Sequence, residues 1–185
     1  MMRLFSLFFL LLAGVAQATE FGTLQAEKSS IAFVSRQMNV PVEGAFRKFA
    51  AQIALDPARP EAGRVQIEID LASIDAGSAE ANDEVKGKSW FSVRDFPRAS
   101  FSSTSVRPLG DGRHEVRGKL NIKGKTLEVR APFTLRQDKD TLVLDGGFPL
   151  KRLDYGIGSG IWSDTSVVAD EVQVKFHFLL TPTRK

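Results

Sequence analysis

The sequence predicts an all-β protein whose antiparallel strands form a barrel or a sandwich. Apolar and polar residues alternate with a period of two over most of the chain, which is the pattern of half-buried strands. Turn-forming pairs such as Asp56-Pro57 and Gly110-Asp111 separate the alternating segments. Only one short segment has the signals of a helix. We therefore expect a predominantly antiparallel β architecture with a helical insert.

About eight segments alternate in this way. In chain order they are 30–35, 44–55, 64–71, 99–109, 114–122, 126–135, 141–152 and 171–180. In the segment 64–71, for example, Val65, Ile67 and Ile69 face one side and charged or amide side chains face the other. The segment 44–55 does not keep one parity between Phe46 and Phe49, so we expect a bend or bulge between them.

The segment 114–135 predicts a β-hairpin with one apolar and one polar face. If Gly124-Lys125 is a two-residue turn, the apolar pairs follow directly. They are Ile122 with Leu127, Leu120 with Val129, Gly118 with Ala131, and Val116 with Phe133. Pro132 has no N–H for a ladder bond, so a bulge there would shift this register by one residue.

A second loop at 137–140 places Ala131 opposite Gly146. Gly118, Ala131 and Gly146 then form a row of small residues on the apolar face. Because protein interiors are close-packed, this row implies that a bulky side chain, the helix or a ligand fills the space beside it. Glycine can also simply bend a barrel strand.

The one helical signal lies at 79–87. Ser78 is a suitable N-cap, acidic residues follow in the first turn, and lysines lie near the end. Four aromatic residues come soon afterwards: Trp90, Phe91, Phe96 and Phe101. Since exposing all of them would be costly, we expect them to plug one end of the barrel or to line a cavity.

Residues 1–18 have the features of a cleaved secretory signal peptide. Arg3 precedes an apolar run, and Ala16-Gln17-Ala18 provides small residues for cleavage. We therefore expect a single mature domain at 19–185, located in a bacterial periplasm. The absence of cysteine excludes thiol catalysis, cysteine metal sites and disulfides, so packing and strand pairing must hold the fold.

The composition and motifs argue against several functions. The net charge is +3 with both signs mixed along the chain, so nucleic-acid binding has no support. His177 falls on a polar face and His114 at the start of a strand, and no catalytic or nucleotide-binding motif accompanies them. We expect no catalytic residues, no catalytic cofactor and no metal.

One polar cluster stands out where a strand runs into a glycine-rich loop. It contains Arg152, Asp154 and Tyr155, followed by Trp162 and Ser163. An arginine at a barrel mouth can bind a phosphate or another polar head group. The alternative is an Arg152–Asp154 surface ion pair beside a loop tyrosine, as most such pairs are structural.

Together these stretches resemble the YceI-like family of polyisoprenoid-binding periplasmic proteins. The resemblance covers nearly all of the mature chain. Its landmarks are Gly44-Ala45-Phe46 with Phe49, Trp90-Phe91, Asp95-Phe96-Pro97, Phe101, Gly118-Lys119-Leu120, Ile122-Lys123-Gly124, Lys151 to Gly156, Val168 and Asp170-Glu171-Val172. Two positions depart from the family, since Ser92 stands where an acid is frequent and Gln37 where a histidine is common.

The resemblance implies an eight-stranded antiparallel, lipocalin-like β-barrel with an apolar tunnel. It implies that the tunnel binds a long isoprenoid lipid, such as a polyprenyl phosphate or a ubiquinone-like molecule, with Arg152, Asp154 and Tyr155 as head-group candidates. The expected tunnel-lining residues are Phe33, Phe46, Phe49, Ile67, Ile69, Trp90, Phe91, Phe96, Phe101, Gly118, Leu120, Val129, Ala131, Phe133, Leu144, Gly146, Phe148, Val174 and Phe176.

Three function classes remain open. We favour a soluble carrier, store or sensor of the lipid, as a monomer or homodimer, with a membrane redox or lipid-handling protein as a further partner. A small outer-membrane β-barrel would fit the strand count, but two Trp and one Tyr supply few residues for aromatic girdles. An enzyme of isoprenoid or quinone metabolism could use the same pocket.

Overall fold

The computed structural model describes residues 20–183. The predicted signal peptide at 1–18 lies outside this range. Eleven strands form one sheet within the described residues, rather than the predicted eight. The strands are β1 (Phe21–Leu24), β2 (Ser30–Gln37), β3 (Val40–Phe46), β4 (Phe49–Ala54), β5 (Arg64–Asp70), β6 (Ile74–Asp75), β7 (Arg98–Gly110), β8 (Arg113–Ile122), β9 (Lys125–Asp138), β10 (Thr141–Lys151) and β11 (Glu171–Pro182).

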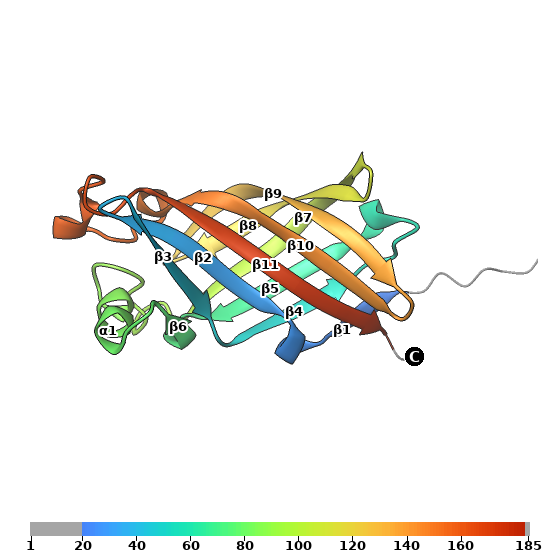
Figure 1. The fold of residues 1–185 in the computed structure, drawn as a ribbon, viewed down its shortest axis with the longest axis horizontal. Coiled ribbons are helices and arrows are strands. Elements are labelled where there is room, and N and C mark those ends of the chain that lie inside the picture. Colours follow the sequence, from blue (N-terminus) through green and yellow to red (C-terminus); the bar gives the residue numbers. More distant parts are fainter. Residues whose placement is uncertain (1–19, 184–185) are drawn as a thin grey trace, which may run out of the picture.

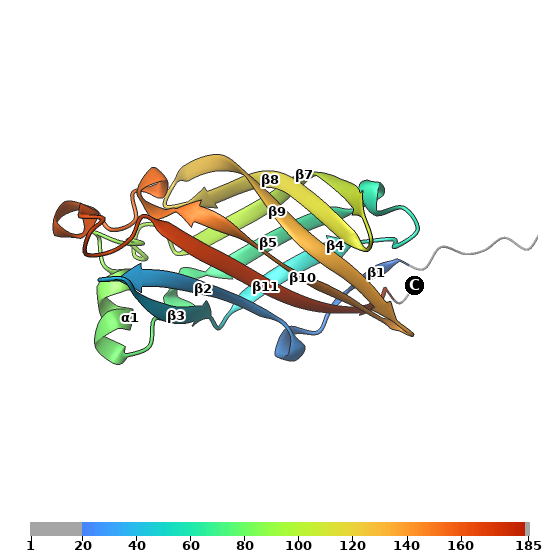
Figure 2. The ribbon, with the colours of Figure 1, turned by 45° about the horizontal axis from the view of Figure 1, so that its top comes forward.

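All neighbouring strands are antiparallel, in the order β4-β5-β7-β8-β9-β10-β11-β2-β3-β6. The sheet curls into an elongated, incomplete barrel (Figures 1 and 2). At one end β1 pairs with β11, and Phe21 exchanges backbone hydrogen bonds of 2.9 and 3.0 Å with Leu55 just after β4. This short strand, which alternation did not reveal, joins the two sides of the sheet and closes that end.

The predicted strand 44–55 is two strands. β3 and β4 are separated by Arg47 and Lys48, and each pairs with a different neighbour: β3 with β2 and β6, and β4 with β5. The expected bend between Phe46 and Phe49 is therefore a complete break. It accounts for the change of parity, because the two phenylalanines no longer belong to one pleated segment.

The predicted register of the 114–135 hairpin is wrong by two residues. The turn is Lys123-Gly124, with φ of 52° and 75°, and Ile122 pairs with Lys125. A two-residue hairpin turn of this type needs positive φ at both central positions and prefers glycine second, so Gly124 occupies the second position and not the first. Because the shift is even, every side chain keeps its predicted face.

The predicted row of small residues is therefore not formed. Gly118 lies opposite Val129, Ala131 opposite Val116, and Gly146 opposite Phe133. The loop predicted at 137–140 is shorter, since Asp138 pairs with Thr141. The β9–β10 ladder ends at the Phe133–Gly146 pair, which adjoins Pro132, and this is consistent with the missing N–H of proline.

The helix α1 (Ala79–Lys86) is confirmed almost residue for residue. The Ser78 side chain accepts a 3.2 Å hydrogen bond from the Ala81 N–H, as an N-cap should. Short 3₁₀ turns lie in the connections between strands: η1 (Ala26–Lys28), η2 (Pro60–Ala62), η3 (Leu71–Ser73), η4 (Arg152–Tyr155) and η5 (Gly160–Ser163). Within residues 20–183, no helix has both the length and the apolar character needed to cross a membrane.

The loop 152–170, which carries η4 and η5, and helix α1 lie at the end of the barrel opposite β1 (Figure 1). At the closed end the core is filled, since Phe21, Leu55, Leu142 and Leu180 are each 0–1% exposed. The fold thus has a solid end at β1 and an end covered only by loops and one helix.

Candidate ligand-binding cavity

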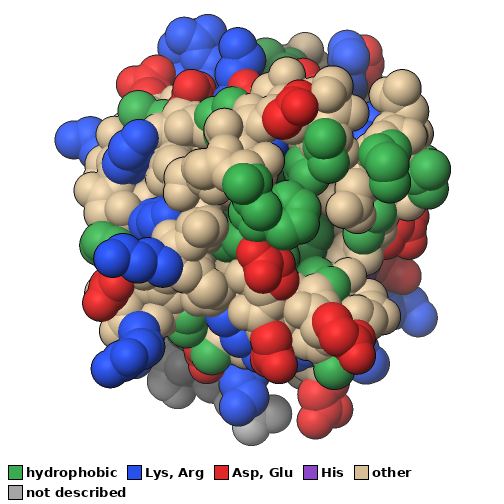
Figure 3. All heavy atoms as spheres, turned by 90° about the vertical axis from the view of Figure 1, so that its left-hand side faces the viewer, with side chains coloured by type: hydrophobic (Ala, Val, Ile, Leu, Met, Phe, Trp, Pro, Cys, Tyr) green, Lys and Arg blue, Asp and Glu red, His purple; other side chains and the backbone are tan. Residues whose placement is uncertain are grey.

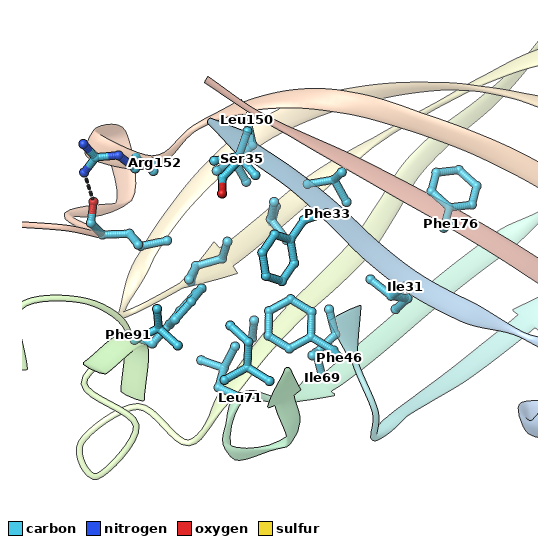
Figure 4. A pocket seen from close by; sticks show the side chains of 18 of the residues that line it. Ile31, Phe33, Ser35, Phe46, Ile69, Leu71, Phe91, Leu150, Arg152 and Phe176 are labelled. Carbon is cyan, nitrogen blue, oxygen red and sulfur yellow. Dashed lines mark hydrogen bonds between the residues drawn. The ribbon is translucent and has the colours of Figure 1, made fainter. Parts of the chain in front are cut away.

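A cavity of about 600 Å³ runs inside the barrel from the loop-covered end toward the solid end. Its deep residues Ile53, Val65 and Phe178 are buried, whereas Gln37, Glu80 and Glu84 at the other end are exposed. The cavity therefore opens at the α1 end. The wall is almost entirely apolar, and Figure 4 shows phenylalanine and aliphatic side chains from several strands converging on it.

Most of the predicted tunnel residues lie in this wall. They are Phe33, Phe46, Ile67, Ile69, Trp90, Phe91, Phe101, Leu120, Ala131, Phe133, Leu144, Phe148, Val174 and Phe176. Five predicted residues do not lie in it: Phe49, Phe96, Gly118, Val129 and Gly146. Phe49 packs against Phe178 in the core, and Phe96 is 36% exposed and lies against the Gly124 turn.

The wall also contains residues that alternation alone did not mark. Helix α1 contributes Ala81 and Val85 as well as the two glutamates, and β2 contributes Ser35 and Gln37 near the mouth. The predicted strand 30–35 correctly indicated which side chains of β2 face inward, but it ended before Gln37. The position of α1 over the mouth depends on tertiary packing, which no local pattern shows.

Three glycines give phenylalanine rings room along the wall. A Cβ added to Gly118 would lie 2.5 Å from Cζ of Phe101, and one added to Gly146 would lie 2.5 Å from Cζ of Phe176. A Cβ on Gly44 would likewise overlap the Phe33 ring. Each ring thus lies over a glycine of the adjacent strand. The space that we predicted beside the small residues is therefore filled by aromatic rings from the adjacent strands. The cavity at the centre of the barrel remains open.

The mouth is framed by two tryptophans and two carboxylates. The rings of Trp90 and Trp162 are 5.4 Å apart, and the Trp90 Nε1–H donates a 3.1 Å hydrogen bond to Glu84. The Glu80 carboxyl is held ionised: its own backbone N–H and the Ser78 hydroxyl lower its pKa. Negative charge therefore lies at the entrance.

Arg152 lies at the mouth but is not available as a head-group ligand. Its side chain is 2% exposed, and burial lowers its pKa. All five N–H donors bind backbone carbonyls at 2.7–3.0 Å, and the acceptors are Ala169, Ile157, Gly158, Trp162 and Val168. The guanidinium therefore holds the 152–170 loop in shape, and the predicted Arg152–Asp154 ion pair is absent from the described residues.

The other two head-group candidates do not line the cavity. Asp154 is exposed on the outer side of η4, where its carbonyl accepts a 3.0 Å hydrogen bond from Lys125. Tyr155 is buried beneath the loop, and its hydroxyl has no partner among the described residues. Burial, with a smaller contribution from Asp154, raises the pKa of Tyr155 to about 12. Its hydroxyl is therefore neutral at physiological pH.

Neither histidine lines the cavity. His114 is buried and stacks on Phe133 with ring centroids 5.3 Å apart, while His177 is partly exposed and pairs with Asp145. Across residues 20–183, no three His, Asp or Glu side chains gather in a way that could hold a metal ion. The arrangement can sequester an apolar molecule.

Comparison with known proteins agrees with this architecture. The family model described as YceI-like domain matches residues 23–180. An Azotobacter vinelandii UPF0312 protein is 31% identical over 121 residues, which is 62% of each chain. A Yersinia pestis UPF0312 protein is 37% identical over 86 residues, or 46% of this chain and 44% of that one. The chain thus spans less than two thirds of the length of these curated relatives.

Solved structures match over more of the chain. Burkholderia cenocepacia BcnA has a TM-score of 0.84 and 47% identity, covering 85% of this chain and 99% of that one. A polyisoprenoid binding domain from Saccharophagus degradans has a TM-score of 0.66 at 18% identity, covering 89% and 99%. The latter likeness concerns the fold alone. With the barrel, the apolar cavity and a family match over nearly the whole described chain, this protein belongs to the YceI-like family.

Proposed function

We propose that this protein holds a long isoprenoid chain in its tunnel and acts in the periplasm as a carrier, store or sensor of that lipid. The observation that carries the proposal is the apolar cavity of about 600 Å³, open at one end. Its volume is typical of small-molecule sites. A hydrocarbon that leaves water for such a wall gains about 25 cal/mol for each Å² of apolar surface buried. The predicted signal peptide supports the location.

The charges at the mouth favour an uncharged head group. Glu80 and Glu84 border the cavity, and Arg152, the only cation that residues 20–183 contribute to its wall, has every donor occupied. A phosphate entering this mouth would meet the like charge of the two glutamates, and Arg152 would have no free donor for it. Of the two predicted lipid classes, a prenyl quinone or another neutral prenyl lipid therefore fits better than a polyprenyl phosphate.

The first test is extraction of the protein from its native host. We expect mass spectrometry of the organic extract to detect a prenyl lipid in stoichiometric amount. A lipid-free protein that also takes up no added prenyl quinone would refute the proposal.

The second test uses the two tryptophans of the chain, both of which lie at the mouth. Titration with a prenyl quinone should quench their fluorescence, whereas a polyprenyl phosphate of equal chain length should bind at least tenfold more weakly. In Glu84→Gln that difference should shrink, because one negative charge is removed. Equal affinity of the wild type for both lipids would disprove the neutral-head-group inference while leaving lipid binding intact.

A blocking variant tests whether the tunnel is the site. Ala131 lines the cavity, so Ala131→Phe should fill part of the bore and weaken prenyl-quinone binding at least tenfold. The matched control is Ala50→Phe on the outer face of β4, where the residue is exposed. Circular dichroism establishes that both variants fold. Unchanged binding in a folded Ala131→Phe variant would exclude the tunnel.

A further inference from the structure

The most exposed large hydrophobic side chains of the described chain surround the mouth of the tunnel. Ile161 is 84% exposed, Met38 70% and Val40 62%. Met38 and Val40 lie at the β2–β3 turn, and Ile161 lies in η5 of the 152–170 loop. Figure 3 views this end of the barrel: hydrophobic side chains gather near its centre, acidic ones lie beside them, and basic ones lie mostly toward the edge.

The turn and the loop form one rim. The Met38 N–H donates a 2.8 Å hydrogen bond to the Val167 carbonyl, and Gln37 forms a β-bridge with Val168. One Arg152 nitrogen donates to both the Trp162 and Val168 carbonyls, at 2.7 Å each. This links Trp162, which follows Ile161, to the segment that pairs with the β2–β3 turn. These contacts join the turn to the loop, so the three exposed side chains lie on one connected rim.

The conformation of the turn is unfavourable for the residue that occupies it. Met38 has φ of 47° and Asn39 has φ of 64°. Such turns favour asparagine, aspartate and glycine, so methionine is an uncommon residue at this position. Met38 gains no burial in return, since most of it is exposed. Exposed large apolar side chains grouped at a binding mouth form a surface suited to contact with an apolar phase outside the molecule.

We propose that this rim docks on a lipid bilayer, with Met38, Val40 and Ile161 entering the headgroup layer, so that a prenyl chain passes from the membrane into the tunnel without crossing water. The inference rests on the proposed function, because a prenyl lipid resides in a bilayer. The rim is continuous with the cavity wall through Trp162 and Val168. Arg36 beside the turn, whose side chain donates a 3.3 Å hydrogen bond to the Asn39 carbonyl, adds a positive charge suited to lipid phosphates.

A bilayer fits this surface better than a protein does. Three protruding aliphatic side chains cover much less than the ~800 Å² that each partner buries in a stable protein interface. A headgroup layer, by contrast, accepts single apolar side chains, and each buried side chain adds independently to the free energy of partitioning.

The test is flotation of the mature protein with phosphatidylcholine vesicles that contain no prenyl lipid. We expect the wild type to float with the vesicles and its tryptophan emission to shift to the blue, because Trp162 adjoins Ile161. The triple variant Met38→Ser/Val40→Ser/Ile161→Ser should lose at least tenfold in partitioning. The control Leu109→Ser removes a 49% exposed hydrophobic side chain from the β7–β8 turn, away from the mouth, and should float like the wild type.

A transfer assay separates docking from ligand binding. Prenyl quinone supplied in vesicles should enter the triple variant at least tenfold more slowly than the wild type, whereas quinone added from dilute ethanol should bind both with equal affinity. Absence of binding from ethanol in the wild type would refute the proposed function, and flotation would still test the docking. Three results would each overturn the bilayer proposal. The first is a wild type that does not float, and the second is flotation abolished by 0.5 M salt, which shortens the Debye length to about 4 Å. The third is a wild-type dimer that the triple variant disrupts and the control does not.

Discussion

At the closed end of the barrel the interior is solid, whereas at the open end the same strands enclose a cavity. Phe21, Leu142 and Leu180 near β1 are at most 1% exposed. Toward the mouth, inward-facing residues such as Phe33 and Phe148 are only half-buried, because they border the cavity. Close packing at one end supplies the stability that lets the other end leave apolar surface unpacked. Substitutions at the two ends should therefore have different consequences.

The largest expected effect is at the loop over the mouth. Arg152→Met removes the five hydrogen bonds that Arg152 donates and leaves buried carbonyls without donors, so the free energy of unfolding should fall by about 3–5 kcal/mol. Urea unfolding measures the loss. Arg152→Lys keeps the charge but not the planar set of donors and should recover only part of the stability. Wild-type stability in Arg152→Met would show that the loop does not depend on this clamp.

The second prediction compares leucines at the two ends. Leu180→Ala should cost about 3 kcal/mol of unfolding free energy, because it opens a cavity in a filled core. Leu150→Ala should cost about 1 kcal/mol, because Leu150 already borders the cavity and gives up fewer contacts (Figure 4). Prenyl-quinone affinity should change only in Leu150→Ala. Equal losses of stability in urea unfolding would contradict the difference between the two ends.

The third prediction concerns Tyr155 and pH. Burial raises the pKa of its hydroxyl to about 12, so the folded protein holds the proton more tightly than the unfolded chain, whose tyrosine ionises near pH 10. The stabilisation is fully present below pH 10 and should be lost as the pH rises to 12, amounting to about 2–3 kcal/mol. The difference in unfolding free energy between the wild type and Tyr155→Phe, measured from pH 9 to 12, isolates this loss.

At neutral pH the same Tyr155→Phe variant should be as stable as the wild type or slightly more stable. The hydroxyl that it removes is buried with no hydrogen-bond partner among the described residues. A clear loss of stability at pH 7 would mean that the hydroxyl is paired after all.

The smallest expected effect is at the glycines of the wall. Gly118→Ala places a methyl group against the Phe101 ring and the Ser102 carbonyl, so it should cost about 1–2 kcal/mol and push the ring into the bore. Prenyl-quinone uptake should fall with it. Adding Phe101→Leu should restore uptake more than stability. The second substitution relieves the contact of the new methyl group with the Phe101 ring and leaves its contact with the Ser102 carbonyl. Uptake unaffected by Gly118→Ala would show that the ring does not limit the bore.

Much of the fold could be predicted because alternation reports which face of a strand is dry. The faces of β5, β8, β9, β10 and β11, and helix α1 with its Ser78 cap, all agree with the structure. The strands that escaped prediction, β1 and β6, are too short to alternate visibly. They exist because distant segments pair with them, as Phe21 does with Leu55. The hairpin register failed because both turn placements preserve parity, and only the φ requirement of Gly124 distinguishes them.

The site was predicted in its apolar part and not in its polar part. Alternation shows which side chains of a strand face the interior, and in a barrel every such side chain borders the same interior space. This is enough to place Phe33 or Phe176 at the cavity wall. The role of Arg152 could not be read in the same way, because its five acceptors come from residues 157–169 and depend on the path of that loop. The glutamates at the mouth were missed for a similar reason, since nothing local shows which surface a helix covers.

Local patterning was enough to identify a β-protein with an apolar inner face, a capped helix and the landmarks of the YceI-like family, because period-two alternation and capping act between residues close in the chain. Whether the inner face encloses a cavity or a filled core became clear from the folded arrangement alone. That outcome depends on how far apart the curled strands lie and where rings such as Phe101 rest against glycines of adjacent strands. The folded arrangement also decided the charge at the mouth, because that charge comes from segments that meet only after folding.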